Sequence, residues 1–526
     1  MLPFNHFTSE QISPLILSAI ILIISVISFK KHLKFSLLFL FIGTIGLGYF
    51  IANLDPFLIL WDEQYHALVA KNMAENFLRP TLYNHPILDF DYTNWSENNI
   101  WLHKQPLFLW QIALSIKVLG TTAFAVRLPS VLMHAIIPLF IYRIGKILIN
   151  KETGYYGALL FAVAYFPLEL VAGRYSTDHN DVAFLFYVTA SFWSWLEYSQ
   201  SKKRYWFILI GLFSGGAVLV KWLMGLLVYV IWTITTAISN YPKNIKIQSY
   251  FPILLSSIIS LLVFLPWQIY IHLKYPIEAA HEMDLNSRHF FEVIEGHRES
   301  TWYYFTDGLE TIYGAGNLIP FILLVSTSLF LVAIKNKKHQ IFITSVIIFV
   351  YLFYTLASTK MVSFPIIVSP IFFLSMGYLI FKILSVIESI IKSSFLNQSI
   401  STSLLVLIAF TTLNLSKIET NHTNLLPYDN HQRANEQMEM NFIQSLDKEL
   451  KKEDYVIFNA SITLNGQIPI MFFTNYIAYK FIPTQSQIEE IRKKGKKVAI
   501  IDLGNIPNYI LLDKEIKVLD VKQTPS

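Results

Sequence analysis

The sequence contains no cysteine among its 526 residues, which excludes disulfide bonds, thiolate metal ligands and thiol nucleophiles. It is also poor in charge, because only 15% of its residues are charged whereas 54% are hydrophobic. A soluble protein of this length carries more charge, and the mean hydropathy of +0.46 agrees with a membrane protein. The net charge of +5 is small and gives no indication of a nucleic-acid partner.

The hydrophobic residues are gathered in long uncharged runs, each long enough for a helix that crosses a membrane. We therefore predict an α-helical polytopic membrane protein with about twelve transmembrane helices. The apolar stretch 106–119 is too short to cross and contains Lys117, which indicates an interfacial or re-entrant helix. The predicted spans are residues 12–29, 35–52, 125–142, 154–172, 182–199, 206–220, 222–239, 251–272, 317–334, 340–357, 362–381 and 399–416.

Basic residues in the short loops predict the orientation, because short loops rich in Lys and Arg stay in the cytoplasm. Lys30, Lys31 and Lys34 lie between the first two spans, which places the loop 53–124 outside. The same rule places the loop 273–316 outside as well. The membrane domain is thus predicted over residues 1–416, with its two large loops on one side.

From about residue 417 charge becomes frequent, and this change predicts a separate extracytoplasmic α/β domain over residues 417–526. Gly504 follows a predicted strand without a glycine-rich loop around it, so no nucleotide-binding fingerprint is present. The predicted elements are helices at 432–451 and 485–494 and strands at 454–459 and 497–503.

Two adjacent carboxylates, Asp62 and Glu63, open the first long polar segment of the chain. At the mouth of a cavity such a pair can hold a divalent metal or accept a proton from a hydroxyl. Alternatively, the pair caps an interfacial helix from Gln64 to Phe77, since acidic residues suit a helix start. Taken alone, the pair leaves both interpretations open.

Further polar residues fall on the same predicted side of the membrane, beneath the external loops. Each has a structural alternative: Lys221 and Lys360 can reach lipid headgroups, and Arg127 can anchor a helix end. The other members of the set are His103, Lys104, Arg174, Asp178, His289 and His297.

The composition of this set indicates a chemistry. Clustered cations suit a phosphate or pyrophosphate, a carboxylate suits activation of a hydroxyl, and apolar interfacial helices suit a lipid substrate. A transporter more often places such groups near the middle of the membrane. The pattern therefore favours an enzyme that transfers a group from a lipid phosphate to an acceptor hydroxyl outside the cytoplasm.

In their order along about residues 50–380, the motifs resemble those of the C-type glycosyltransferases (the GT-C superfamily). Within it they are most similar to the protein O-mannosyltransferases and the lipid A aminoarabinose transferases, that is, to glycosyltransferase family 39. The resemblance is carried by Asp62-Glu63, His103-Lys104-Gln105-Pro106, Val126-Arg127-Leu128-Pro129-Ser130, Arg174 to Asp178, Val220-Lys221-Trp222, Pro266-Trp267, His297 with Trp302-Tyr303-Tyr304, and Ser358-Thr359-Lys360.

The resemblance implies a GT-C fold and a polyprenyl-phosphate-linked sugar as the donor. It implies that Asp62 is the reacting base, with Glu63 beside it in the catalytic pair. The residues that it places at the donor phosphate are Lys104, Arg127, Arg174, Lys221 and Lys360, and further site candidates are Asp178 and His289.

Two positions depart from the family pattern: His103 stands where a carboxylate is common, and Gln105 replaces a proline. In the aminoarabinose transferases that carboxylate and a loop histidine bind zinc. The resemblance thus makes His103, with His289 or His297, a candidate site for a divalent metal such as zinc, magnesium or manganese.

The sequence leaves the sugar open, and the acceptor can be a lipid, a glycan or a protein. A surface-glycan polymerase or ligase, or a transporter of lipid or glycan, is the alternative function. The external Asp62-Glu63 pair favours the transferase, because transport does not require it. The resemblance implies a multi-pass protein of the bacterial inner (plasma) membrane, surrounded by membrane lipid, with its active site facing the periplasm or cell exterior.

Overall fold

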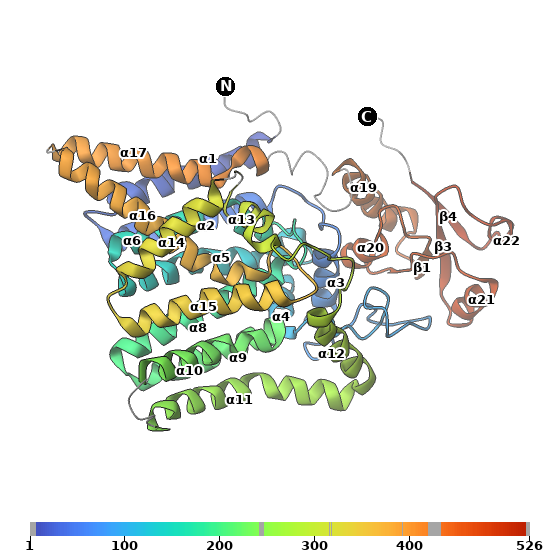
Figure 1. Ribbon diagram of the computed structural model, residues 1–526. Coiled ribbons are helices and arrows are strands. Elements are labelled where there is room, and N and C mark those ends of the chain that lie inside the picture. Colours follow the sequence, from blue (N-terminus) through green and yellow to red (C-terminus); the bar gives the residue numbers. More distant parts are fainter. Residues whose placement is uncertain are drawn as a thin grey trace.

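The apolar runs of the sequence form the long helices of a bundle, and a small α/β domain lies against one end of it (Figure 1). The computed structural model describes residues 7–240, 247–314, 316, 318–391, 393–418 and 433–521. Parts of the predicted C-terminal domain, 419–432 and 522–526, lie outside the described residues. The predicted fold class, a helical membrane bundle followed by a small α/β unit, is confirmed.

The bundle consists of α-helices and short 3₁₀ segments labelled η. Its elements are α1 (Ser9–Ser28), α2 (Leu33–Ala52), α5 (Ala123–Leu148), α6 (Lys151–Ala162), α7 (Tyr165–Val171), α8 (Asp178–Ser201), α9 (Arg204–Lys221), η1 (Trp222–Leu226), α10 (Leu227–Asn240), η2 (Ile247–Tyr250), α11 (Phe251–Lys274), α14 (Ile319–Ala333), α15 (Lys337–Leu356), η4 (Phe364–Val368), α16 (Ser369–Ile390) and α17 (Ser394–Leu413). The two long loops contain α3 (Asp62–Glu75), α4 (Pro106–Leu119), α12 (Pro276–Phe291), η3 (Tyr303–Phe305) and α13 (Asp307–Tyr313).

Within the described residues, eight helices are long and apolar enough to cross a membrane, or nine if the bent pair α6–α7 is one span. That number treats Arg204–Asn240 as one run, although the chain reverses within it. At the reversal, the Ser214 hydroxyl of α9 donates a hydrogen bond to the carbonyl of Gly225 at 2.7 Å. Each predicted span falls on helical structure in the described residues, although 154–172 is divided between α6 and α7, and the number of crossings stays a prediction.

Glycine allows the helices at the centre of the bundle to approach closely. A Cβ atom on Gly145 of α5 would lie 2.5 Å from the Cα atom of Gly154 on α6. Small residues at helix contacts are typical of membrane bundles, where packing replaces the hydrophobic effect as the main attraction. Any larger residue at these two positions would therefore separate α5 from α6.

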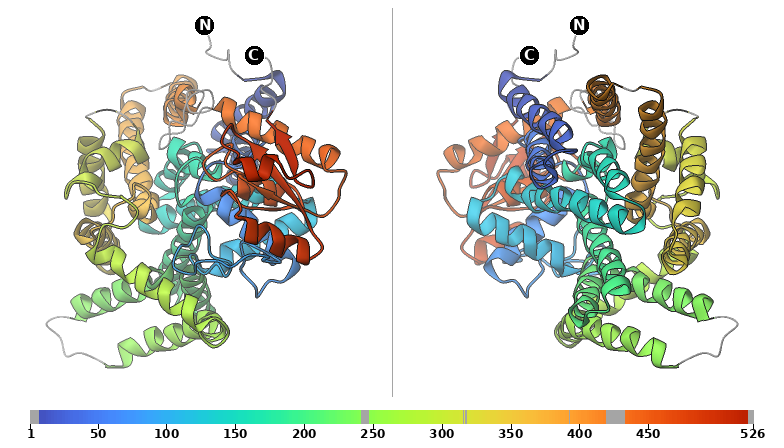
Figure 2. Two further views of the ribbon diagram at one scale, coloured as in Figure 1. Left: turned by 90° about the vertical axis from the view of Figure 1, so that its right-hand side faces the viewer. Right: turned by 90° about the vertical axis from the view of Figure 1, so that its left-hand side faces the viewer.

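The helices α3, α4 and α12 lie at the same end of the bundle as the C-terminal domain (Figure 1). Seen from that end, the domain covers the blue α3–α4 region and leaves the green α11–α12 region uncovered (Figure 2, left). The structure thus brings the two long loops and the C-terminal domain together, which agrees with the even number of spans predicted between them.

The C-terminal domain is a parallel four-stranded sheet with the order β2-β1-β3-β4. The two predicted helices correspond to α19 and α21, and the two predicted strands correspond to β1 and β3. The sequence did not predict the strands β2 and β4 or the short helices α20 and α22. The elements are α19 (Arg433–Glu449), β1 (Tyr455–Phe458), α20 (Gln467–Phe473), β2 (Ile477–Ala478), α21 (Gln485–Lys493), β3 (Lys497–Asp502), α22 (Asn508–Leu511) and β4 (Lys517–Asp520).

The domain holds the loop 53–124 from two directions. Ile87 and Leu88 of this loop are buried in the hydrophobic core of the domain beside Val456. The Lys71 ammonium of α3 donates to the carbonyl oxygens of Met471 and Thr474, at the C-terminal end of α20. These carbonyls have no partner within the helix, so the lysine caps α20 and fixes it on α3.

A buried ion pair fixes the beginning of α3 against α5. The Arg127 guanidinium donates to both carboxylate oxygens of Glu63, at 2.7 and 2.9 Å. Its remaining bonds go to the backbone carbonyls of Ala52, Asp55 and Phe57. Both side chains are fully removed from solvent, and every donor of the guanidinium has a partner.

We predict that the loop 53–124 and the C-terminal domain face the cell exterior. Because the sequence has no cysteine, single cysteines introduced at Phe90 and Asn441 are the only thiols that a reagent can label in the protein. Both should be labelled in intact cells by a membrane-impermeant thiol reagent. A cysteine at Lys203, in the loop between α8 and α9, should react only after permeabilisation. Labelling at Phe90 but not at Asn441 in intact cells would contradict the topology.

We predict that Arg127→Met destabilises the protein by about 3–5 kcal/mol, because Glu63 would be left as an unpaired buried charge. The double variant Arg127→Met/Glu63→Gln should recover part of this loss. Arg143→Met is the matched control, since the Arg143 side chain is 39% exposed beside Glu197 and its pair contributes less. Thermal unfolding in detergent measures all three, and equal losses in the first and third variants would contradict the prediction.

Candidate active site

A cavity of about 1440 Å³ opens among the starts of α3 and α8, the segment before α4, the reversal from α9 to η1, and the helices α11 and α12, beside the end of α15. Many of its polar side chains come from the two long loops and from helix ends, and many of its apolar side chains come from the predicted spans. The polar members include Asp62, His103, Lys104, Lys221, His289, Glu295 and His297, and the apolar members include Leu223, Phe264, Leu265, Ile269 and Phe353. One compartment therefore joins a charged region to a surface that suits a lipid chain.

Asp62 lies at the polar end of the cavity, as the first residue of α3. Its Oδ1 atom is 3.6 Å from the Nζ atom of Lys104, and its Oδ2 atom accepts a hydrogen bond from the backbone N–H of Thr177 at 3.0 Å. Burial opposes ionisation of this carboxylate, but Lys104, His66 and the Thr177 amide outweigh it and hold the pKa of Asp62 well below its usual range. Asp62 is therefore ionised throughout the neutral pH range.

The backbone on both sides of this carboxylate is strained. Trp61 has φ 72° and Thr177 has φ 70°, in the left-handed region that non-glycine residues rarely adopt. The Thr177 hydroxyl also donates to Asp181, which pairs with Lys221. Strain of this kind is typical of functional sites, where the surrounding structure imposes it. Here the strained residues stand next to Asp62 and at Thr177, whose backbone N–H donates to the Asp62 carboxylate.

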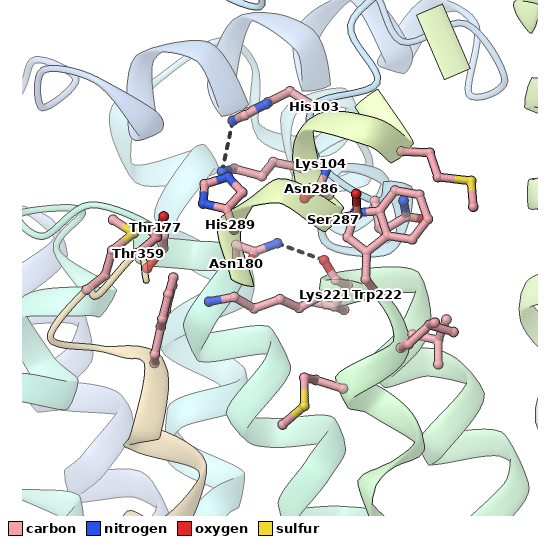
Figure 3. A pocket seen from close by; sticks show the side chains of 18 of the residues that line it. His103, Lys104, Thr177, Asn180, Lys221, Trp222, Asn286, Ser287, His289 and Thr359 are labelled. Carbon is pink, nitrogen blue, oxygen red and sulfur yellow. Dashed lines mark hydrogen bonds between the residues drawn. The ribbon is translucent and has the colours of Figure 1, made fainter. Parts of the chain in front are cut away.

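Two lysines enter the cavity from different elements (Figure 3). Lys104 precedes α4, and Lys221 is the last residue of α9, where the chain reverses. Lys221 pairs with Asp181 and lies 4.6 Å from the centre of the Phe364 ring. Between them, the Asn180 amide donates to the carbonyl of Val220 at 2.9 Å. The arrangement leaves two ammonium groups, each about one-fifth exposed, directed toward one space.

The histidines of the cavity make contacts of their own. His103 stacks on Trp95 at 4.6 Å, its Nδ1 atom is 3.3 Å from Glu282, and its Nε2 atom is 3.2 Å from the Lys104 ammonium. An ammonium has only donors, so Nε2 accepts from Lys104 and Nδ1 donates to Glu282. Burial lowers the pKa of His289 to about 4, so this ring is neutral at neutral pH.

The predicted metal site does not fit this arrangement. Both ring nitrogens of His103 already have partners, and an ammonium group lies on the one that would face His289 and His297. In the part of the chain that the structure describes, no three His, Asp or Glu side chains are grouped to hold a metal ion. We therefore derive no catalytic step through a metal, and metal dependence stays a prediction.

Five of the predicted site residues do not line the cavity. Glu63 and Arg127 pair with each other, and Arg174 pairs with Glu169 and Asp55 in a second buried cluster. These placements change our interpretation, because the donors of Arg127 are all occupied and Arg174 is buried between two carboxylates, so neither guanidinium is placed to bind a donor phosphate. Glu63 and both arginines instead position the segments that carry Asp62.

The other two residues lie close behind the cavity wall. Asp178 is fully buried, with its Oδ1 atom 3.0 Å from the Nδ1 atom of His66. Lys360 donates to the carbonyl of Ala357, and its backbone N–H donates to the carbonyl of His297. Lys360 therefore ties the loop 273–316 to the end of α15, while its neighbours Thr359 and Met361 line the cavity.

Sequence reasoning missed several residues that the fold brings to the site. Trp61, Trp95, Thr177 and Asn180 line the cavity, and His66 lies beneath Asp62. A signal existed for His66, because residues four apart share one face of a helix. No comparable signal existed for Trp95, which reaches the cavity from an irregular loop.

Comparisons with known proteins bear on the family and the fold of the chain. Residues 103–270 match the model of a family described as dolichyl-phosphate-mannose-protein mannosyltransferase. Over 189 residues the chain is 28% identical to an uncharacterized protein of Aquifex aeolicus (strain VF5). That match spans about a third of either chain, 33% of this one and 34% of the relative.

Two solved structures share the fold across most of the chain. ArnT from Cupriavidus metallidurans bound to undecaprenyl phosphate superposes with a TM-score of 0.62 at 10% identity, over 92% of this chain and 89% of that one. The oligosaccharyltransferase AglB from Archaeoglobus fulgidus, in complex with an inhibitory peptide and a dolichol-phosphate, gives 0.52 at 11% identity, over 89% and 69%. The chain therefore has the GT-C glycosyltransferase fold, and the resemblance inferred from its motifs is confirmed.

Proposed function

We propose that this protein is an integral-membrane glycosyltransferase that moves a sugar from a polyprenyl-phosphate donor to an acceptor hydroxyl on the extracytoplasmic side. One observation carries the proposal: an ionised carboxylate, Asp62, lies 3.6 Å from the Lys104 ammonium in a cavity that also has an apolar wall. The family match and the shared fold support a lipid-linked sugar transferase in general terms.

In this proposal the donor enters with its lipid chain along α11 and α15, against Leu265, Ile269 and Phe353. Its phosphate lies between Lys104 and Lys221, because two ammonium groups neutralise the charge that develops on the leaving group. The lipid carries one phosphate, so lysines that act as point charges suffice without a bidentate arginine.

The reaction then needs one base. Asp62 Oδ1 accepts the proton of the acceptor hydroxyl while the oxygen forms a bond to the anomeric carbon of the sugar. The bond from that carbon to the phosphate oxygen breaks, and its electron pair leaves with the polyprenyl phosphate. Direct displacement of this kind inverts the anomeric configuration. The acceptor oxygen gains the sugar, the lipid retains the phosphate, and Asp62 holds the proton.

A transporter or a surface-glycan polymerase accounts less well for this geometry. Transport does not require an ionised carboxylate fixed by a strained backbone beside a phosphate-binding lysine. Incubation of the purified protein with a panel of labelled polyprenyl-phosphate sugars tests the proposal directly. Consumption of one donor with release of polyprenyl phosphate is expected, and consumption of none would contradict it.

We predict that Lys104→Ala and Lys221→Ala each weaken donor binding by about 1.5–3 kcal/mol, the usual contribution of a hydrogen bond to a charged group. Titration with polyprenyl phosphate measures the effect. Lys117→Ala is the matched control, because Lys117 is an exposed lysine of α4 that contacts the Phe77 ring outside the cavity. Donor affinity that stays unchanged in both cavity variants would remove these lysines from the site.

We predict that Asp62→Asn lowers turnover by about 100- to 10,000-fold, the usual effect of removing a general base, while donor binding is kept. Asn preserves the shape and the acceptor for the Thr177 amide but removes the basic oxygen. Asp91→Asn, an exposed acidic residue of the same loop, is the control. If Asp62→Asn kept near-normal turnover with saturating donor and acceptor, Asp62 would not be the base, and its role would be to cap the start of α3.

A further inference from the structure

A buried carboxylate, Asp181, joins two charged groups that the proposed reaction uses, although it does not itself line the cavity. Asp181 lies in the first turn of α8, and its side chain is only 1% exposed. One of its oxygens accepts from the Lys221 ammonium, and the other accepts from the Thr177 hydroxyl. The backbone N–H of Thr177 donates in turn to the Asp62 carboxylate at 3.0 Å. One side chain therefore connects a lysine proposed for the phosphate with the proposed base.

The position of Thr177 depends on this contact. Thr177 precedes α8, where a threonine side chain usually accepts a hydrogen bond from the first N–H groups of the helix. Within the described residues it makes no such bond, and its hydroxyl instead donates to Asp181 and contacts the Ser363 hydroxyl at 2.9 Å. The Thr177 backbone has φ 70°, and strain of this kind persists only where the surroundings impose it. Asp181 and Ser363 hold the side chain of the residue whose N–H is directed to Asp62.

Asp181 also fixes the direction of Lys221, the last residue of α9. A lysine side chain is flexible and its ammonium has three donors, of which Asp181 takes one. The Phe364 ring lies 4.6 Å from the same ammonium. A second tie between the two helices is the Asn180 amide, which donates to the carbonyl of Val220 at 2.9 Å. The Lys221 ammonium is thereby held at the cavity wall, about one-fifth exposed, with further donors for a phosphate.

The carboxylate has a second effect, because its negative charge weakens the attraction between Lys221 and an anion. Both ammonium groups have a carboxylate partner: Lys104 lies 3.6 Å from Asp62, and Lys221 pairs with Asp181. A phosphate between the lysines therefore shares them with two carboxylates. The effect is larger for polyprenyl phosphate, a monoester with about 1.5 to 2 negative charges at neutral pH, than for the donor, a diester with a single charge. Asp181 thus favours release of the phosphate product.

We propose that Asp181 is a positioning residue that keeps the base and the phosphate-binding lysine in a fixed relation and limits how tightly the phosphate is held. The inference rests on the proposed function and adds a residue to the same site. Asp181 touches neither substrate, and it acts on Asp62 through Thr177 and on the phosphate through Lys221. The two contacts have separable consequences, because the bond to Thr177 affects turnover and the charge beside Lys221 affects phosphate binding.

Three variants of the full-length protein separate these effects. Asp181→Asn keeps the shape but removes the charge, so its affinity for polyprenyl phosphate should rise by about three- to tenfold. Thr177→Val removes the hydroxyl but keeps the branched shape and the backbone N–H, so turnover should fall by about 10- to 100-fold at unchanged phosphate affinity. Asp181→Ala should show both changes. Adding Thr177→Val to Asp181→Ala should lower turnover no further, because both remove the same contact.

Titration of the purified protein with polyprenyl phosphate measures the affinity, and turnover is measured with the donor identified by the panel. Thr177→Ser keeps the hydroxyl and should recover the turnover that Thr177→Val loses. The matched control is Glu197→Gln, which changes a carboxylate near the other end of α8 that pairs with Arg143 and does not line the cavity. It should alter neither turnover nor phosphate affinity.

Phosphate affinity that is unchanged or lower in Asp181→Asn would overturn the proposal. So would wild-type turnover in Thr177→Val, or turnover losses that add in the double variant. If Asp181→Ala fails to fold, Asp181→Asn and Thr177→Val carry the test. The phosphate titration needs no donor sugar, so its result is independent of the donor panel that tests the proposed function. Activity retained by Asp62→Asn would instead overturn the assignment of the base.

Discussion

The buried ion pair between Glu63 and Arg127 is the constraint on which the site depends. It joins the first turn of α3 to α5 and to the backbone of the segment before α3. Neighbouring residues on a helix point about 100° apart. Once Glu63 is fixed on Arg127, Asp62 therefore points in a different direction, and in this structure it lines the cavity. The two adjacent carboxylates thus have different surroundings: Glu63 is paired inside the protein, and Asp62 lines the cavity as the proposed base.

Lys104 connects the base to the proposed donor. In the protein without a ligand it stabilises the charged form of Asp62, together with the Thr177 amide. A phosphate bound between Lys104 and Lys221 would share the field of that ammonium. We expect Asp62 then to become a better proton acceptor at the moment when the leaving group is in place. The order of events would follow from electrostatics without a moving lid.

The C-terminal domain acts on the cavity through the loop 53–124. Ile87 and Leu88 enter the domain core, while Trp95 and Ser96 of the same loop line the cavity. Lys480 of the domain pairs with Glu97, next to these residues. The domain therefore holds in place a loop that has little regular structure of its own, and with it the aromatic surface on which His103 stacks.

The sequence by itself determined the helical membrane bundle, the α/β character of the C-terminal domain and the polar residues from which the site is drawn. Long uncharged runs have few folds open to them, because every backbone group in a membrane must be bonded within a helix. It also singled out Asp62, Lys104 and Lys221, which the structure brings to one cavity. Only the tertiary structure decided that Arg127 and Arg174 are occupied by buried carboxylates and that Asp62 is backed by His66 and Asp178. The types and order of residues do not record which charges meet, since Asp62 and Asp178 are separated by several helices in the chain. Their contact is set by how α3 and α8 pack.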